Sequence, residues 1–152
     1  MPKQSAGILL YRMTDNQPQV FLVHPGGPFF RNKDEGAWSI PKGEYVDGEE
    51  ALAAALREFE EETGQAISGK FIELQPIKQK SGKVVQAWAV EGDIDHDTIK
   101  SNLFEIEWPP RSGKKVSFPE IDRASWFTID IAKQKIIPAQ AGLIQELEGL
   151  IS

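Results

Sequence analysis

The 152-residue chain contains no cysteine, and this absence removes several classes of protein at once. Disulfide scaffolds, thiolate zinc sites, iron–sulfur centres and cysteine nucleophiles are all excluded. No apolar run approaches the roughly 20 residues that a membrane-spanning helix requires, and residues 1–5 lack the hydrophobic region of a secretory signal. We therefore expect a cytoplasmic protein without a membrane partner.

Basic residues are also few, since 17 Lys and Arg stand against 23 Asp and Glu, for a net charge of −6. That balance argues against nucleic-acid binding driven by bulk charge. At 40% hydrophobic, the chain can form one domain over residues 1–152. The sequence gives no indication of the oligomeric state. The negative charge is uneven, because the segment from Glu49 to Glu62 holds six carboxylates and a single base.

Hydrophobic periodicity predicts a mixture of strands and helices. Asp47 is a good N-cap with Glu50 three residues later, and Gly64 is a stop signal, so the acidic segment should be a helix. Its apolar face would consist of Leu52, Ala55, Leu56 and Phe59. The expected strands cover residues 5–12, 20–24, 71–80, 84–91, 103–108, 116–118 and 125–128, and further helices cover 129–135 and 139–151. Strands surrounding a few helices predict a mixed α/β domain.

Three carboxylates of the acidic segment share one edge of the expected helix. On a helical wheel, Glu58, Glu61 and Glu62 form a stripe beside the apolar face rather than opposite it. Hard divalent cations such as Mg²⁺ prefer oxygen ligands, and this stripe would supply them at the edge of a core. Arg57 stands four residues before Glu61 and would orient that carboxylate through an ion pair. A solvated helix face without any ligand is the alternative interpretation.

Two residues upstream of this helix suit a phosphate site. Gly43 lets the backbone approach a ligand closely or adopt a positive φ angle, and its carbonyl oxygen would be a further metal ligand. Lys42 is placed to meet a phosphate. No G-x4-G-K-[ST] pattern occurs in the sequence, which excludes a P-loop nucleotide site.

The whole segment reads Gly43-x5-Glu49-x7-Arg57-Glu58-Phe59-x-Glu61-Glu62-x-Gly64. It resembles the signature of the Nudix hydrolases, G-x5-E-x7-R-E-U-x-E-E-x-G-U, in which U is a bulky apolar residue. All seven glycine and charged positions agree, and Gln65 departs from the pattern at the last apolar position. The resemblance implies a Nudix-type α/β/α sandwich with a mixed β-sheet, in which the signature forms a loop, a helix and a loop.

The same resemblance implies an enzyme that hydrolyses a nucleoside diphosphate linked to another group, with Mg²⁺ or Mn²⁺ as cofactor. By position, Glu58, Glu61, Glu62 and the Gly43 carbonyl match the family's metal ligands. The expected substrate is a small nucleotide, best a dinucleoside polyphosphate or a nucleoside triphosphate, and the only nucleic acid expected is an RNA 5′ end. Two alternatives are a non-catalytic nucleotide-sensing module on the same fold and an acidic surface for protein interaction.

Family members commonly use one more acid from outside the signature. Residues 118–126, FPEIDRASW, resemble the P-E-x-D…W segment of the RNA and dinucleoside polyphosphate branch, which implies Glu120 as general base or extra metal ligand. The alternative general base is one of the signature glutamates Glu58, Glu61 and Glu62, which we also count as catalytic. Other acids nearby are Asp122 and the pair Glu105 and Glu107, which share one face of an expected strand. A turn with surface carboxylates is the plain alternative. Residues 38–43, WSIPKG, also resemble the W-x-x-P-K-G lead-in of that branch.

Two other patterns, one of aspartates and one of histidines, are weaker indications of a metal site. Asp93, Asp95 and Asp97 alternate as at the start of a calcium-binding loop, but the positions that require glycine and glutamate hold Thr98 and Phe104. The two histidines at positions 24 and 96 have no paired spacing, so neither suggests a zinc site. We expect no metal at either place.

Two further segments suit a long substrate. The basic loop at residues 111–115 would either hold distal phosphates or form a solvated hairpin turn. The pair Phe29–Phe30 would either stack on a base or pack a long loop onto the core.

Overall fold

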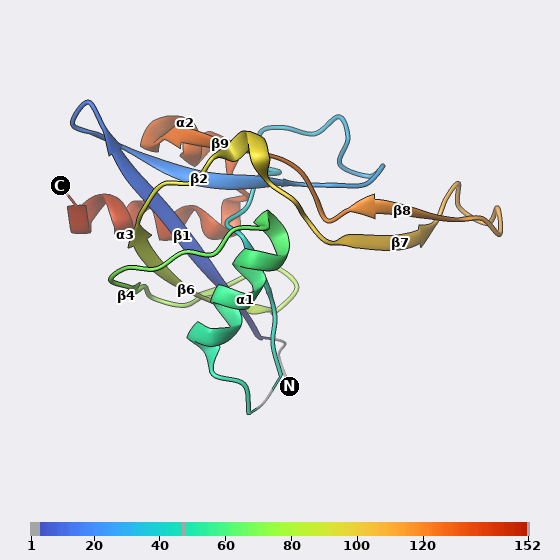
Figure 1. Cartoon of the computed structure of the whole chain (residues 1–152), viewed down its shortest axis with the longest axis horizontal. Coiled ribbons are helices and arrows are strands. Elements are labelled where there is room, and N and C mark those ends of the chain that lie inside the picture. Colours follow the sequence, from blue (N-terminus) through green and yellow to red (C-terminus); the bar gives the residue numbers. More distant parts are fainter. Residues whose placement is uncertain (1–3, 47, 152) are drawn as a thin grey trace.

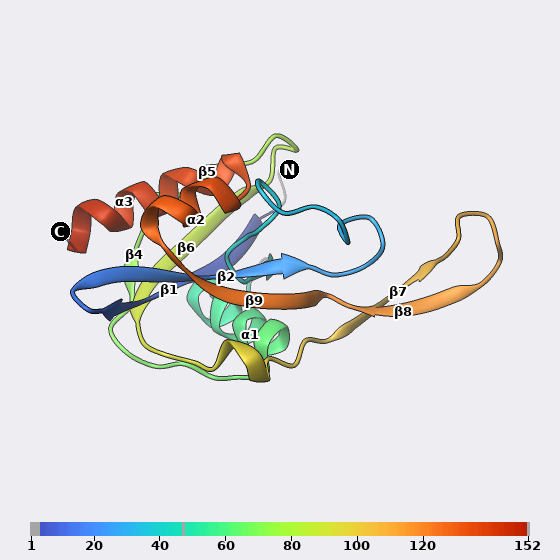
Figure 2. The same ribbon diagram turned by 90° about the horizontal axis from the view of Figure 1, so that it is seen from above.

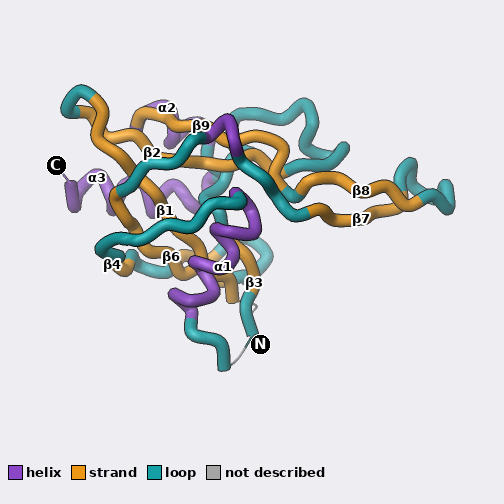
Figure 3. The backbone as a smooth tube through the Cα atoms, in the orientation of Figure 1, coloured by secondary structure: helices purple, strands orange, loops and turns teal. Residues whose placement is uncertain are grey.

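The computed structural model describes residues 4–46 and 48–151. Its strands are β1 (Gln4–Thr14), β2 (Gln17–Pro25), β3 (Lys42–Glu44), β4 (Ile72–Glu73), β5 (Ile77–Lys78), β6 (Val84–Glu91), β7 (Leu103–Glu107), β8 (Lys115–Pro119) and β9 (Ile121–Thr128). Its helices are α1 (Ala51–Thr63), α2 (Ile129–Lys135) and α3 (Ala141–Ile151), with 3₁₀ turns η1 (His96–Thr98) and η2 (Pro138–Gln140). Figures 1 and 3 show how they are arranged. Within the described residues, no helix has the length and apolar character needed to span a bilayer.

One mixed sheet forms the middle layer of the molecule. Its strands follow the order β4-β6-β1-β2-β9, with β3 paired to β1 and β5 paired to β6. The central strands β1 and β6 run parallel, whereas β2 is antiparallel to both β1 and β9. Parallel neighbours require a long crossover connection, and the connection between β1 and β6 contains α1, the helix of the acidic segment.

Both faces of this sheet are apolar, because β1 directs alternate side chains into two different cores. Ile8 and Leu10 point into the core that α1 closes with Phe59. Leu9 and Tyr11 point into the second core, which residues of α2 and α3 complete. Figure 2 shows α2 and α3 on one side of the sheet and α1 on the other. The predicted α/β/α sandwich with a mixed sheet is confirmed.

The prediction of one continuous strand over residues 71–80 is wrong. Pro76 has no N–H to donate, so it interrupts the ladder, and the chain forms the two short strands β4 and β5 on either side of it. The strand β3 was not predicted, because three residues carry no periodic pattern. Its pairing with β1, in which Gly43 lies opposite Ala6, is what makes it extended.

The start of α1 also differs from the prediction. The helix begins at Ala51 with Glu50 at the N-cap position, and the Glu50 side chain makes no cap hydrogen bond. The predicted N-cap, Asp47, lies outside the described residues. At the other end, Gly64 ends the helix as predicted, with a φ of 77° that favours glycine and an N–H that donates to the Glu60 carbonyl.

The strands β7 and β8 form a two-stranded sheet of their own, which projects from the sandwich (Figures 1 and 2). We call β7, β8 and the connecting residues 108–114 the arm. The loop of residues 26–36, which we call the facing loop, projects on the same side and contacts the arm. There the rings of Phe29 and Trp108 meet edge to face with centroids 5.4 Å apart.

Candidate active site

Helix α1 is anchored on the sheet by small and aromatic side chains. Ala55 and Phe59 are fully buried, whereas Leu52 and Leu56 are half-buried at the margin of the same core. The Phe59 ring lies 6.1 Å from the ring of Phe21 on β2. The apolar face lies where the sequence predicts it, with its two leucines at the border rather than at the centre.

The three signature carboxylates lie at this border with graded burial. Glu62 is only 8% exposed, whereas the side chains of Glu58 and Glu61 are 12% and 37% exposed. The alternative interpretation, a solvated helix face, applies to Glu60, which is exposed. We call Glu58, Glu61 and Glu62 the acidic edge of α1.

Strand β3 passes directly against the acidic edge at Gly43. A Cβ atom at this position would lie 2.1 Å from the Oε2 atom of Glu58, a distance that no side chain can adopt. Of the two roles that the sequence leaves open for this glycine, close backbone approach is the one found, and its φ lies outside the left-handed region. The Gly43 backbone and the Glu58 carboxylate are therefore neighbours, as a shared ligand set requires.

Arg57 holds the carboxylates around it in place. Its Nη1 donates to Glu58 at 2.9 Å and to Glu61 at 3.3 Å, and the second of these is the predicted i,i+4 pair. Its Nε and Nη2 donate to the two oxygens of Glu49 at 3.0 and 3.3 Å. The fork to Glu49 fixes the plane of the guanidinium, which in turn orients the acidic edge.

Burial and mutual repulsion perturb the ionisation of this group. Burial, followed by the nearby charge of Glu58, raises the pKa of Glu62 to about 8. Burial and then the charge of Glu61 also raise the pKa of Glu58. Burial lowers the pKa of Lys42, and the charges of Glu62 and Glu58 partly oppose that shift. The acidic edge therefore carries more negative charge than its protein neighbours compensate, and a cation would stabilise it.

Glu120 lies in the turn between β8 and β9, where hydrogen bonds fix its backbone. Its N–H donates to the Asn102 carbonyl at 2.8 Å, and its carbonyl accepts from the Gly26 N–H at 2.8 Å. The Asn102 N–H donates in turn to the Glu61 carbonyl at 3.0 Å, which links Glu120 to α1. Burial and then the charge of Glu61 raise the pKa of Glu120, so the two carboxylates are within electrostatic range.

The other acids near Glu120 in the sequence lie in different settings. Glu105 and Glu107 are exposed on the arm, and the Glu105 carboxylate is 4.0 Å from Lys115. Asp122 is bound to the buried His24, whose Nδ1 is 2.8 Å from the Asp122 Oδ1. Of the acids considered in this stretch, Glu120 is the one that the pKa shifts connect to the acidic edge.

The donor set of this edge fits a divalent cation, because carboxylate and carbonyl oxygens are the ligands that Mg²⁺ prefers. The carboxylates are not drawn together around one point, since Arg57 bridges Glu58 and Glu61. Among residues 4–46 and 48–151, the group whose ligand atoms all lie within 4.8 Å is the turn of Asp95, His96 and Asp97. In that turn, an Asp95 oxygen accepts the Asp97 N–H at 2.9 Å, so helix capping accounts for the clustering.

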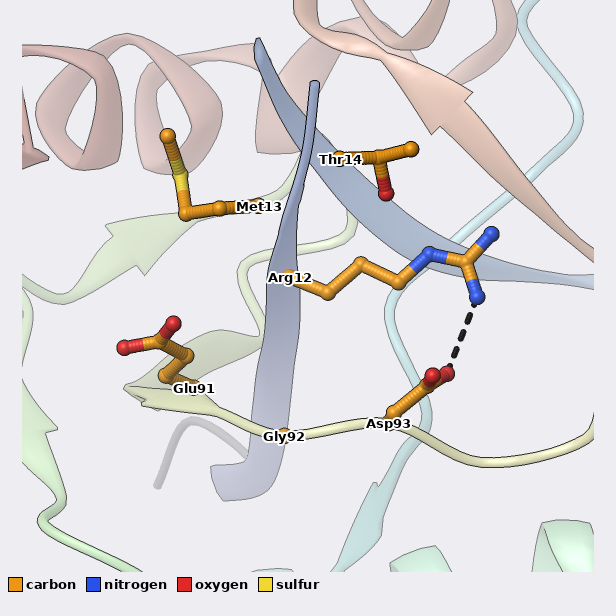
Figure 4. Close-up of a pocket in the computed structure, with 6 residues that line it drawn as sticks. All are labelled: Arg12, Met13, Thr14, Glu91, Gly92 and Asp93. Atoms are coloured by element: carbon orange, nitrogen blue, oxygen red, sulfur yellow. Dashed lines mark hydrogen bonds and ion pairs between the residues drawn. The ribbon is translucent and has the colours of Figure 1, made fainter. Parts of the chain in front are cut away.

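Two surface hollows of about 460 Å³ each lie in different surroundings. The first lies between α1 and the root of the arm and is lined by Arg57, Glu60, Glu61 and Asn102. The second lies where β1 and β6 end, and Figure 4 shows Arg12 reaching across it to Asp93 at 2.9 Å. The same guanidinium lies 4.2 Å from the ring centroid of Trp126. The first hollow adjoins the acidic edge, whereas the second is crossed by the ion pair between Arg12 and Asp93.

Sequence reasoning missed three contributors to this arrangement. Glu49 was read as part of the signature without a role, although it clamps Arg57. No sequence pattern marks Asn102, because it links Glu61 to Glu120 through its backbone N–H and carbonyl groups. His24 was read only as a lone histidine, whereas it is fully buried and bound to Asp122, a residue 98 positions away.

Comparison with known proteins identifies the family to which this fold and signature belong. The model of the NUDIX domain family matches residues 1–147. An RNA pyrophosphohydrolase of Novosphingobium aromaticivorans is 44% identical over 54 residues, which is 36% of this chain. The match spans about a third of that relative's length, namely 31%.

Solved structures share the fold at low sequence identity. The NUDIX domain of Shewanella oneidensis NrtR, complexed with ADP ribose, is 15% identical with a TM-score of 0.69, over 100% of this chain and 90% of that one. An Ap4A hydrolase of C. elegans in a binary complex is 17% identical with a TM-score of 0.67, over 97% of each chain. The fold, the glycine and charged positions of the signature and the family match together lead to one conclusion: the chain belongs to the NUDIX domain family.

Proposed function

We propose that this protein is a divalent-metal-dependent hydrolase that cleaves a pyrophosphate linkage in a nucleoside polyphosphate. The observation that carries the proposal is that Glu120 lies within electrostatic range of the acidic edge of α1, where Arg57 forms ion pairs with Glu58 and Glu61. The name of the curated relative, an RNA pyrophosphohydrolase, supports the reaction class. The structural relatives with ADP ribose and with Ap4A hydrolase activity in their descriptions support a small nucleotide as ligand.

The residues at the site have distinct proposed roles. Glu58, Glu61 and Glu62, with the Gly43 carbonyl, would hold Mg²⁺ or Mn²⁺. When bound, such ions neutralise charge on phosphoryl oxygens and activate water. Lys42, at the rim of the same group, counters phosphate charge. A dinucleoside polyphosphate or a nucleoside triphosphate is the substrate class that we favour.

Two residues act without being signature ligands. Glu120 has a raised pKa and a fixed backbone, which suits a carboxylate that takes a proton from the attacking water or adds an oxygen ligand. Arg57 is a positioning residue, because its contacts are with Glu49, Glu58 and Glu61.

A phosphate-release screen tests the proposal. Nucleoside triphosphates, dinucleoside polyphosphates, nucleotide sugars and 5′-triphosphorylated RNA are each incubated with Mg²⁺ and with Mn²⁺. Turnover of at least one substrate, abolished by EDTA, is the expected result, and product analysis in ¹⁸O-labelled water locates the attacked phosphorus. Tight nucleotide binding without turnover of any of them would instead favour the non-catalytic sensing module.

Two further proposals concern the domain organisation and the cellular location. The family match over residues 1–147 supports a single Nudix domain spanning the chain. The cytoplasmic location stays a prediction from the sequence.

A further inference from the structure

We infer that the arm and the facing loop bind a second nucleotide unit of the substrate, beyond the anhydride that is attacked at the acidic edge. The inference rests on the proposed function and narrows its substrate class. It favours substrates that contain more than one nucleoside, such as a dinucleoside polyphosphate or a 5′-polyphosphorylated RNA, over a mononucleotide.

The root of the arm lies at the site itself. Glu120 follows β8 directly, Asn102 precedes β7, and the hollow between α1 and the arm is lined by Asn102 and Glu61. The five residues of β8 lead outward from Glu120 to the tip, a path of roughly 17 Å at about 3.4 Å per residue. A ligand that extends from the acidic edge along the arm therefore reaches the tip without leaving the protein surface.

Aromatic rings lie exposed along this path. Gly27 brings the facing loop so close to the arm that a Cβ atom there would lie 2.9 Å from the ring of Phe104. Beyond it, Phe29 meets Trp108 edge to face, yet Phe29 remains 62% exposed and Phe30 remains 40% exposed. Packing onto the core, the alternative role for this pair, therefore leaves much of both rings uncovered. Exposed π faces beside basic groups are what single-stranded nucleotide chains stack on.

The charge of the same region is opposite to that of the whole protein. The facing loop and the arm together contain five basic and four acidic side chains, a net charge of +1 in a chain of net charge −6. Of the two acids in the facing loop, Asp34 is paired with Lys135 on α2. Arg111 and Lys114 lie exposed at the tip. Arg111 has a φ of 64°, a conformation that Gly or Asn adopts more easily, so turn geometry does not account for an arginine at this position. A phosphate-bearing ligand matches this local charge.

The acidic residues of the arm do not oppose this surface. Along β7, Glu105 and Glu107 alternate with Phe104 and Ile106, so they lie on the other face of the two-stranded sheet. Lys115 lies on that face too, 4.0 Å from Glu105. The experiment therefore uses Arg111 and Lys114.

The test compares the variant Arg111→Gln/Lys114→Gln and the variant Phe29→Ala with wild type. A matched control is Lys78→Gln/Lys80→Gln, which removes the same charge from exposed positions outside the arm and the facing loop. Hydrolysis is measured on ATP, on diadenosine tetraphosphate and on a 5′-triphosphorylated RNA of about eight nucleotides. Binding is measured separately in EDTA, by fluorescence anisotropy of the same RNA carrying a 3′ label.

We expect kcat/KM on one or both of the longer substrates to fall about tenfold in Arg111→Gln/Lys114→Gln and in Phe29→Ala, and to change less than about twofold on ATP. Loss restricted to diadenosine tetraphosphate identifies a second nucleoside as the occupant, and loss restricted to RNA identifies the nucleotide chain. If RNA is the occupant, the salt dependence of its binding weakens in the double variant by a slope of about 1.4. The control should match wild type throughout.

Two results would overturn the inference while leaving the proposed function intact: equal activity of all variants on every substrate, or equal losses on ATP and on the longer substrates. A wild-type protein that hydrolyses none of the substrates overturns the proposed function. In that case the anisotropy comparison still decides whether the arm binds a nucleotide chain.

Discussion

Two acidic clusters in the described part of the chain differ in what stabilises their charge. At the turn of Asp95, His96 and Asp97, the ligand atoms lie within 4.8 Å of one another, but the carboxylates are exposed and an Asp95 oxygen caps the turn. At the acidic edge of α1, the carboxylates are farther apart but largely removed from water, and the pKa of Glu62 is raised to about 8. Proximity of oxygen atoms is therefore a weaker indication of a metal site than burial of charge without compensation.

The largest expected effect is that of Glu62→Gln, which keeps the shape of a buried side chain and removes its charge. Turnover should fall about 10²–10³-fold, because the contribution of Glu62 is electrostatic. Steady-state kinetics at saturating Mg²⁺ measure this, and Asp97→Asn in the other cluster serves as the control, with an expected change below about twofold. Equal turnover in wild type and Glu62→Gln would remove the distinction between the clusters.

The pH dependence of stability should also report the buried charge of the acidic edge. The pKa of Glu62 is about 8 in the folded protein against 4.5 as a free side chain, so the folded state binds this proton more tightly. Without metal, the free energy of unfolding should therefore fall as pH rises from about 4.5 to 8, by roughly 3–5 kcal/mol for this group. Urea unfolding in EDTA at several pH values measures the slope.

Two comparisons sharpen this pH experiment. Glu62→Gln should flatten the dependence, and added Mg²⁺ should restore stability most strongly at the higher pH, where the metal meets an ionised carboxylate. A wild-type slope that survives in Glu62→Gln would assign the effect to other groups.

Gly43→Ala tests the close packing of the acidic edge. The new methyl group would meet the Glu58 carboxylate at 2.1 Å, so we expect a loss of about 1–3 kcal/mol in stability and at least about tenfold in kcat. The matched control is Gly142→Ala on α3, where a Cβ atom meets nothing within 4 Å. There alanine should stabilise the helix by about 0.5–1 kcal/mol. Similar outcomes for the two glycines would contradict the packing argument.

The smallest effect is expected for Arg57→Lys, which keeps the positive charge but loses the fork to Glu49. We expect kcat/KM to fall by about tenfold and the Mg²⁺ concentration for half-activation to rise, because the carboxylates lose their orientation. Arg12→Lys, whose guanidinium pairs with Asp93 away from the acidic edge, is the control for the loss of an arginine ion pair. An unchanged Mg²⁺ dependence in Arg57→Lys would argue against a positioning role.

Much of this arrangement is predictable from the sequence, because it depends on local spacing. Helix α2 occupies residues 129–135, as its apolar period predicts. The edge position of Glu58 and Glu62 and the pair between Arg57 and Glu61 follow from 3.6 residues per turn. The placement of Glu120 opposite α1 required the family resemblance, since no local pattern relates it to that helix.

The remaining features depend on contacts between distant segments. Strand β3 is extended because it pairs with β1, and α1 begins later than the sequence predicts, with Glu50 itself at the N-cap position. The link from Glu61 through Asn102 to Glu120 uses backbone groups, which every residue possesses and no sequence pattern marks.

The buried ring of His24 has a consequence for substrate choice. Its Nε2 lies 2.6 Å from the Lys33 carbonyl, which can only accept a hydrogen bond, and its Nδ1 contacts Asp122 on β9. The facing loop is thus joined through the buried His24 ring to the strand that begins beside Glu120. If that loop receives the far nucleoside, its separation from the reacting phosphorus is set by the protein scaffold, and the number of phosphates in the bridge becomes a criterion of selection.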